Sequence, residues 1–561
     1  MDEILVIGKD DEDGMHYFYY CILTQLKDEF DENRSNNSAT ILYKVISKIL
    51  NGQEKVTVVI DNNYIDKIYR DCYYNHFSGK HFEYSRYCKR VFLFLGDCCE
   101  YIAAYNEEKL QDNFIGCFVV KPLKVGAIGR TLLNPKYIFG DYDSKNIYVR
   151  TTNYCVHLRG MKLFVNAFPY SMQDSETLTC AESTLLNIFD YYSNQYSDYK
   201  FMLPSEIFNV AKLNGYERIL PATGMSYMLM SRIMVEFGFY PRLYLKDAIK
   251  NDEELIRILS YYVESAIPVA IGICREDHYN HSIACIGHGK NRIENMLKKL
   301  YRVSTNDFVE DDIENVVEDV LYIADSANTI DEYIVMDDNL EPYSIYKTTI
   351  KKNDAISNEE VKLNNSQLIC LAVPLYKRMY LEAKDARAIC VEILKEKQLS
   401  FVAQYQKLFF KSIGTEENPI VIRIFLASSR NFKNDRIMAF KEDDICKKIY
   451  SVTPFPQFVW VCELYDLKHY KNQKPLGEIV LDATSTANTK PFDSVIMVNY
   501  PGKYLTRHYN GSSNEIIEDI MCELDCLSNL ETVGGYKLLK FEAKLDFFKM
   551  YKSNLHKVSD L

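Results

Sequence analysis

The clearest pattern of polar and apolar positions in the chain begins at Thr179. Thr179-Cys-Ala-Glu182 has the form of a helix capping box, in which the threonine and the glutamate satisfy each other's backbone amides. Apolar residues then recur at the spacing of one helical face, at Ala181, Leu185, Ile188, Phe189 and Tyr192. The pattern predicts a helix that buries one face and begins at Cys180. A thiol at this position feels the positive end of the helix dipole, which favours the thiolate.

Other segments predict strands and helices along the whole chain. Strands are expected at 55–60, 90–95, 114–120, 147–152, 155–159, 162–168, 267–273, 281–287, 332–337, 368–374, 420–427, 458–464, 477–482 and 494–499. Helical spacing is found at 39–50, 64–74, 204–213, 223–239, 252–264 and 385–395. This mixture predicts an α+β protein.

Length and changes of pattern predict several domains. A chain of 561 residues is several times the usual size of one domain. We assign residues 1–165 to an N-terminal mixed α/β domain, 166–350 to a central domain and 351–561 to a C-terminal mixed α/β domain. Pro169 marks the entry to the central domain, and an acidic segment at about 290–320 is predicted to be a surface insertion in it.

Composition narrows the classes of function. Apolar residues make up 47% and charged residues 26% of the chain, as in ordinary globular proteins. The net charge of −12 argues against a nucleic-acid partner, and no apolar run or N-terminal signal predicts a membrane span or secretion. The sixteen cysteines include no pair with zinc-site spacing, so we expect reduced thiols in a cytoplasm, without a metal or cofactor. The richness in Asn, Lys, Ile and Tyr is typical of a bacterial coding bias.

The chain offers the groups that a nucleophilic thiol needs on both sides of Cys180. Gln173, seven residues upstream, can donate an amide hydrogen to an oxyanion. His281 opens a continuous apolar strand and can act as the base. We expect Asp337, at the end of a later strand, to hold the imidazole in one tautomer, with Asp325 as the alternative acid.

The neighbours of these residues receive other assignments. Asp338 is expected to cap the turn that follows the strand, and His278 and His288 are the alternative bases.

Gln173…Cys180-Ala, then His281-Ser-Ile-Ala-Cys-Ile-Gly, then a strand ending in aspartate resemble the papain-like cysteine peptidases. The group most similar in character is that of the bacteriocin-leader-processing (double-glycine) peptidases. The resemblance covers about residues 165–350. It implies a cysteine-bearing helix packed on an antiparallel sheet, with Cys180 as nucleophile, His281 as base and acid, Asp337 orienting His281, and Gln173 in the oxyanion hole.

The chain departs from that pattern in three places. The interval from Gln173 to Cys180 is longer than usual, Ala181 replaces a frequent glycine, and a long insertion separates the histidine from the acid.

We therefore expect an intracellular thiol hydrolase that cleaves an amide bond of a protein or peptide substrate. A deamidase or a transglutaminase-type acyl transferase would use the same triad. The alternative outside the enzymes is a scaffold that keeps the papain-like fold without the activity. Its flanking domains would then carry the function through partner proteins.

Overall fold

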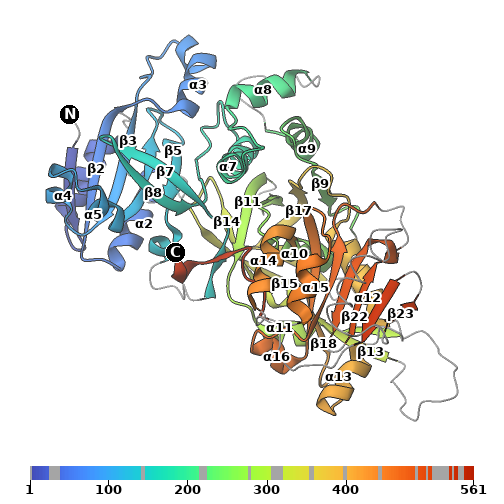
Figure 1. Cartoon of the computed structure of the whole chain (residues 1–561). Helices are drawn as coiled ribbons and strands as arrows, with labels where there is room; N and C mark the ends of the chain where they lie inside the picture. The colour runs from blue at the N-terminus through green and yellow to red at the C-terminus, as the bar shows by residue number, and fades with distance from the viewer. Residues whose placement is uncertain are drawn as a thin grey trace.

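The computed structural model describes most of the chain. The described residues are 3–23, 38–139, 146–213, 224–249, 251–275, 279–304, 320–352, 359–395, 401–439, 445–486, 491–500, 503–507, 530–533, 536–540 and 549–561. Within them the protein is a mixed α+β structure with sixteen α-helices, three large sheets and one separate β-hairpin (Figure 1). The predicted α+β class is confirmed at this level.

The N-terminal sheet is an antiparallel meander whose strands lie in chain order. Its strands are β1 (Glu3–Gly8), β2 (Lys55–Tyr64), β3 (Cys88–Leu95), β4 (Phe114–Val120) and β5 (Ile128–Leu133). Side chains alternate between its two faces. Phe92 and Phe94 pack under the hairpin of β7 (Thr152–Leu158) and β8 (Met161–Ala167), whereas Val91 and Leu93 face the core that contains α2 (Ser38–Asn51). The helices of this region are α1 (Glu12–Leu23), α3 (Lys67–Asn75), α4 (Cys99–Ala103), α5 (Glu107–Asp112) and α6 (Pro135–Phe139).

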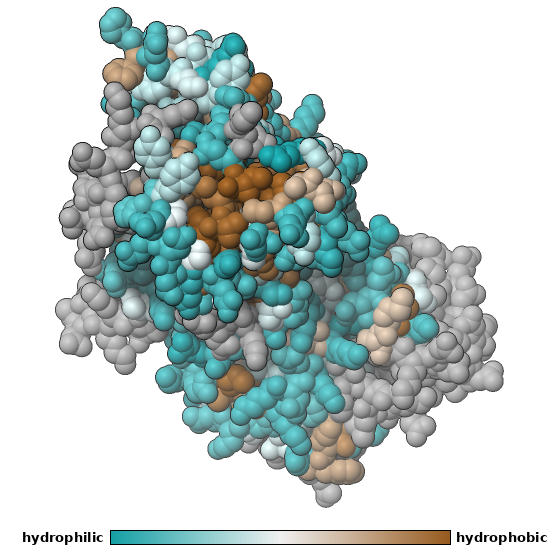
Figure 2. All heavy atoms as spheres, turned by 90° about the vertical axis from the view of Figure 1, so that its left-hand side faces the viewer, coloured by the Kyte–Doolittle hydropathy of each residue, from teal (hydrophilic) through white to brown (hydrophobic). Residues whose placement is uncertain are grey.

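Strand β1 forms the free edge of this sheet in the described part of the chain. Its Ile4, Leu5 and Val6 are only partly buried. Figure 2 views the molecule from this side and shows hydrophobic residues gathered in one patch with polar residues around it. An apolar patch and an edge strand are surfaces that soluble proteins normally keep small or covered.

The central sheet closes into a ring of six antiparallel strands. The pairings run from β10 (Val269–Cys274) to β11 (Asn280–His288), β14 (Glu332–Met336), β15 (Ser344–Lys352), β16 (Glu359–Leu363), β17 (Ser366–Val373) and back to β10. β9 (Arg242–Leu245) is added beside β17, and β6 (Tyr148–Val149) joins β11 to β25 (His556–Lys557). Two helices cover the strands, α7 (Cys180–Gln195) on one face and α10 (Asp252–Glu264) on the other (Figure 1).

The alternation along β11 shows how one strand serves both helices. Ala284 and Ile286 belong to the core that contains α7, whereas Ile283 and Cys285 belong to the core that contains α10. The small side chain of Ala284 leaves room for close approach of α7. The nearby helices α8 (Pro204–Leu213) and α9 (Tyr227–Glu236) pack against each other on the outer side of α7.

The C-terminal sheet lies between two layers of helices. Its order is β12 (Tyr301–Ser304), β13 (Val320–Asp325), β18 (Ile420–Ser428), β19 (Phe458–Tyr465), β20 (Gly477–Asp482), β21 (Val495–Tyr500), β22 (Lys503–Arg507), β24 (Tyr536–Lys540) and β23 (Leu530–Val533). Helix α12 (Ala383–Lys395) packs on one face, and α14 (Ser429–Ala439) and α15 (Ile445–Val452) pack on the other. The remaining helices are α11 (Ile293–Leu297), α13 (Phe401–Phe409) and α16 (Leu467–Lys471).

The sheets do not follow the expected domain boundaries. Residue 350 falls within β15, and β16 and β17 complete the ring that contains β11. Part of the expected insertion forms α11 and β12. Strand β12 pairs with β13, which pairs in parallel with β18 of the C-terminal sheet. Residues 305–319 of the insertion lie outside the described residues. The central and C-terminal units are therefore interleaved along the chain.

A buried network of charges joins these two units. Arg436 on α14 donates to Glu478 at 2.8 Å and to Glu463 at 2.7 Å. Arg423 on β18 donates to Glu463 and, at 2.9 Å, to Glu264 at the end of α10. Arg436, Glu463 and Glu478 are fully buried, so each charge depends on the others for compensation.

None of the described helices is both long enough and apolar enough to span a membrane.

Replacing Arg436 by methionine should destabilise the C-terminal sheet by about 3–5 kcal/mol, because it removes the cation paired with the buried carboxylate of Glu478 and leaves Glu463 with Arg423 alone. The measurement is chemical denaturation followed by fluorescence of Trp460, the single tryptophan, which is buried in β19 of the same sheet. Arg430→Met is the matched control, since Arg430 is exposed on the same helix, and it should change stability by less than about 0.5 kcal/mol. Equal effects of the two substitutions would contradict the role assigned to the network.

Candidate active site

Cys180 is the first residue of α7, as the sequence predicts. The capping box forms: the backbone N–H of Thr179 donates to the Glu182 carboxylate at 2.9 Å, and the Thr179 hydroxyl donates to the same oxygen. Most of the helix is buried, but the Cys180 side chain remains partly exposed. The thiol therefore lies at the positive end of a buried helix and stays accessible to a substrate.

The loop before Cys180 is held by one carboxylate. Asp174 Oδ1 accepts hydrogen bonds from the backbone N–H groups of Glu176 at 3.0 Å, Thr177 at 2.6 Å and Leu178 at 2.8 Å. Gly126 lies against this loop, where a Cβ atom would stand 1.8 Å from the Gln173 carbonyl oxygen. The backbone from Gln173 to Cys180 thus has little freedom to shift.

His281 and Cys180 lie side by side because α7 packs against β11. The Thr184 hydroxyl of α7 donates to the Ser282 carbonyl of β11 at 3.1 Å. The Cys180 thiol lies close enough to the His281 side chain to contribute to raising the pKa of His281. Burial by itself would lower the pKa of His281, but the hydrogen bond to Asp337, the Cys180 thiol and the charges of Asp337 and Asp338 raise it to about 10. The imidazolium is thus the favoured form of this side chain.

Asp337 follows β14 and accepts hydrogen bonds from four groups. His281 Nε2 lies 2.7 Å from its Oδ1, which also accepts from the Asn339 backbone N–H at 2.9 Å. Its Oδ2 accepts from the Tyr346 hydroxyl at 2.5 Å and from Arg275 at 3.2 Å. Burial alone would raise the pKa of Asp337, but these donors, with His281 foremost, lower it. Since Nε2 is bound to Asp337, Nδ1 is the ring nitrogen left for the thiol.

Gln173 reaches the same group of residues through Asn339. Its side-chain amide donates to Asn339 Oδ1 at 2.9 Å, and Asn339 Nδ2 lies 3.4 Å from His281 Nε2. The structure thus brings together Gln173, Cys180, His281 and Asp337.

Asp338 differs from its expected role. The turn is capped by Asp337, whose carboxylate accepts the Asn339 N–H, whereas neither oxygen of Asp338 accepts a hydrogen bond from the described residues. Its carboxyl is buried, with Oδ1 3.5 Å from His281 Nε2. Burial raises the pKa of Asp338 to about 7.

The alternative acid and the alternative bases lie elsewhere or outside the described residues. Asp325 is buried at the end of β13, where it accepts from the Tyr261 hydroxyl at 2.5 Å and from Arg387 at 2.8 Å. His288 is the last residue of β11, seven residues after His281. At a rise of about 3.3 Å per residue, the two histidines are about 23 Å apart along the strand. His278 lies outside the described residues. Of the two acids considered, Asp337 is the one beside His281.

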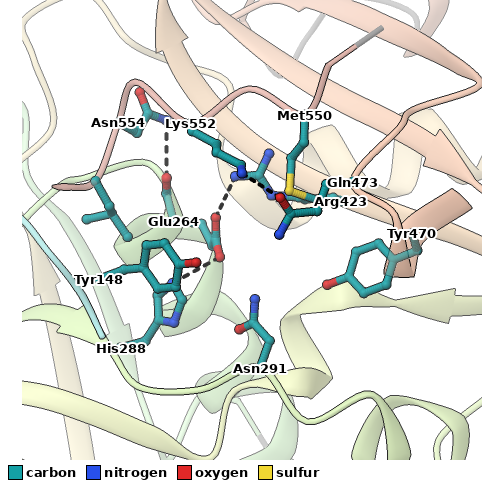
Figure 3. Close-up of a pocket in the computed structure, with 11 residues that line it drawn as sticks. Tyr148, Glu264, His288, Asn291, Arg423, Tyr470, Gln473, Met550, Lys552 and Asn554 are labelled. Carbon is teal, nitrogen blue, oxygen red and sulfur yellow. Dashed lines mark hydrogen bonds and ion pairs between the residues drawn. The ribbon is translucent and has the colours of Figure 1, made fainter. Parts of the chain in front are cut away.

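A pocket lies near His288, between the central and C-terminal units (Figure 3). His288 Nε2 is 3.2 Å from Glu264, whose other oxygen accepts from Arg423, and the ring stacks on Tyr148. Figure 3 shows the side chains of Tyr470 and Asn291 at the edge of the same space. His288 thus belongs to the contact between units.

Sequence reasoning missed Asn339, Tyr346 and Arg275. Asn339 and Asp338 follow Asp337 directly, so the run Asp-Asp-Asn at a strand end was a local signal. Tyr346 lies on β15 and Arg275 directly follows β10, so their approach to Asp337 depends on sheet register.

One group of described residues has donor atoms close enough to hold a metal ion. His281, Asp337 and Asp338 offer three atoms within 4.8 Å of one another. The cation of Arg275, bound to Asp337, works against a second cation at this position.

No protein-family model matches the chain, and no curated protein matches its sequence.

Replacing Asp337 by asparagine should lower the pKa of His281 by about 1–3 pH units, because it removes the carboxylate that holds the imidazolium. The measurement is an NMR titration of the His281 ring. Asp325→Asn is the matched control, since it removes a buried carboxylate that has other partners, and it should leave the His281 titration unchanged. If Asp325→Asn lowered the pKa of His281 and Asp337→Asn left it unchanged, Asp325 would be the acid.

Substituting Gly126 by alanine should destabilise the protein by about 1–3 kcal/mol and slow alkylation of Cys180, because the new methyl group displaces the Gln173 backbone. Gly96→Ala is the control for backbone strain. Gly96 has a φ of +68°, close to the +64° of Gly126, but no atom within 4 Å of its Cβ position. Unfolding free energy and the alkylation rate are measured for both variants. The prediction fails if the Gly96 and Gly126 substitutions behave alike.

Proposed function

We propose that the protein is a papain-like cysteine hydrolase that cleaves an amide bond in a peptide or protein substrate. Cys180 is the nucleophile, His281 the base and acid, and Asp337 the group that orients His281. One observation carries the proposal: a partly exposed thiol at a helix N-terminus lies beside an imidazole, and Nε2 of that imidazole is bound to a buried carboxylate.

The electrostatics of the site favour an ion pair. The hydrogen bond from Nε2 to Asp337 fixes the ring orientation and stabilises the imidazolium. The α7 dipole stabilises the thiolate. Proton transfer from the Cys180 thiol to His281 therefore yields two charges that the surroundings already stabilise.

The reaction follows from these positions. The thiolate attacks the carbonyl carbon of the amide, and the carbonyl electrons move to its oxygen. As the tetrahedral intermediate collapses, the C–N bond breaks and His281 gives its proton to the leaving amine, which leaves an acyl thioester on Cys180. His281 then takes a proton from water, the hydroxide attacks the thioester, and the acid product and the thiol are released.

Donors for the oxyanion come from two directions. The backbone N–H of Cys180 lies in the first turn of α7, where amides have no carbonyl partner within the helix. The side-chain amide of Gln173 donates to Asn339 in the absence of a substrate, and in the proposal it also faces the oxyanion. Asn339 then has a role of its own, since it holds the Gln173 amide beside the imidazole.

The first test is the reactivity of the thiol. With limiting iodoacetamide near pH 6, Cys180 should be alkylated at least about tenfold faster than the exposed Cys155, because an unperturbed thiol is less than about 1% thiolate at that pH. Mass spectrometry of the digested protein gives both rates in one experiment. His281→Ala should abolish the difference. Equal rates in the wild type would refute the nucleophile assignment.

The second measurement concerns the reaction itself. A peptide library incubated with the protein should show new termini by mass spectrometry, and Cys180→Ala should show none. Capture of an electrophilic acyl probe should likewise depend on Cys180. If wild type and Cys180→Ala give the same products and the same capture, the scaffold alternative replaces the enzyme.

A further inference from the structure

The carboxyl group of Asp338 is a titratable group at this site that the catalytic scheme leaves unused. Its side chain is only 3% exposed, and neither oxygen is hydrogen bonded within the described residues. The nearest ionisable partner is His281, whose Nε2 lies 3.5 Å from Oδ1. An uncompensated buried carboxylate is strongly unfavourable, so the ionised form depends on a nearby cation.

Two cations face Asp338. The imidazolium of His281 and the guanidinium of Arg275 favour its ionised form, and the adjacent Asp337 disfavours it. The Tyr170 hydroxyl lies close enough to feel both carboxylates, and it donates to the Leu340 carbonyl rather than to either. Arg275 is bound to Asp337, so the imidazolium is the cation whose presence changes during catalysis.

Ionised Asp338 and protonated His281 therefore stabilise each other. By linkage, whatever ionises Asp338 raises the proton affinity of His281, and whatever protonates His281 favours loss of the Asp338 proton. Since the proton on His281 comes from the Cys180 thiol, ionised Asp338 also favours the thiolate form of Cys180. The hydrogen bond between His281 and Asp337, which orients the ring, does not depend on Asp338, because Asp337 is held by donors of its own.

We propose that Asp338 is a positioning residue that controls the fraction of Cys180 present as thiolate. It does so by holding a second negative charge, which can be titrated, beside His281 Nε2. This role rests on the proposed function. When Asp338 is ionised, the thiolate–imidazolium pair is favoured; when it is protonated, the pair loses one of its two anions. Cys180 is therefore more reactive at pH values above the range in which Asp338 titrates than at pH values below it. The buried position of Asp338, whose pKa is raised to about 7, brings this change into the neutral range.

The test is the pH dependence of Cys180 alkylation in the full-length protein. Wild type should show a fall in rate as the pH decreases through about 7. Asp338→Asn keeps the shape of the side chain and removes the charge. It should abolish that inflection and reduce the rate at pH 7.5 about tenfold or more.

Glu341→Gln is the matched control. Glu341 is an acid of the same turn that is paired with Lys48 and has no contact with the imidazole, so its substitution should leave the profile unchanged. NMR titration of the His281 ring in all three proteins reports the same coupling independently: its pKa should fall in Asp338→Asn and stay in Glu341→Gln. A thermal unfolding curve for each variant separates loss of the charge from loss of the fold.

The outcomes separate the two hypotheses. If Cys180 in the wild type reacts no faster than Cys155 at any pH, the proposed function is refuted. If Cys180 is hyperreactive but Asp338→Asn leaves both the alkylation profile and the His281 titration unchanged, only the role of Asp338 is overturned. If Asp338→Asn does not fold, Asp338→Ser is measured in the same way, with the same two outcomes deciding.

Discussion

The packing of α7 against β11 is the contact on which the candidate active site depends. It places a cysteine and a histidine from distant parts of the chain side by side, and the contact includes a small residue, Ala284, and one side-chain hydrogen bond from Thr184 to the Ser282 carbonyl. The helix contributes its dipole and the strand contributes a rigid anchor for the imidazole. The helix carries the thiol and the strand carries the imidazole, so neither element supplies both groups alone. The Asp174 carboxylate and Gly126 then fix the loop that enters the helix, so the thiol and its upstream glutamine move as one body.

The two neighbouring aspartates show how differently one strand end can treat identical side chains. Asp337 is satisfied by four donors from four parts of the chain, which keeps it ionised and fixed in place. Asp338, one residue later, points to the same imidazole nitrogen without a hydrogen bond. A fully satisfied carboxylate provides orientation, whereas an unsatisfied one is sensitive to the charge of its neighbour. The site thus combines Asp337, which stays ionised, with Asp338, whose ionisation depends on the charge of His281.

Local signals in the sequence predicted much of this arrangement. The capping box and apolar face defined α7 and put Cys180 at its first position, and the strand patterns defined β11 and β14, at whose ends His281 and Asp337 lie. What could not be predicted depends on strand register and on pairing between distant segments. The approach of Tyr346 and Arg275 to Asp337 is of this kind, and so is the parallel pairing of β13 with β18. The closure of the ring by β16 and β17 depends on long-range pairing in the same way, because a strand pattern does not reveal which sheet the strand will join.

The excursion of the chain between β11 and β14 has a mechanical consequence. The polypeptide leaves the ring after the strand that His281 opens, supplies β12 and β13 to the neighbouring sheet, and returns to form the strand that ends at Asp337. The strands that carry His281 and Asp337 are therefore attached to the C-terminal sheet by covalent tethers as well as by the Arg423–Glu264 ion pair. A displacement of that sheet would pull on both strands together, and strands are stiff along their length. The segment that carries His281 and Asp337 consequently cannot be excised or exchanged as a module without also taking strands from its neighbour.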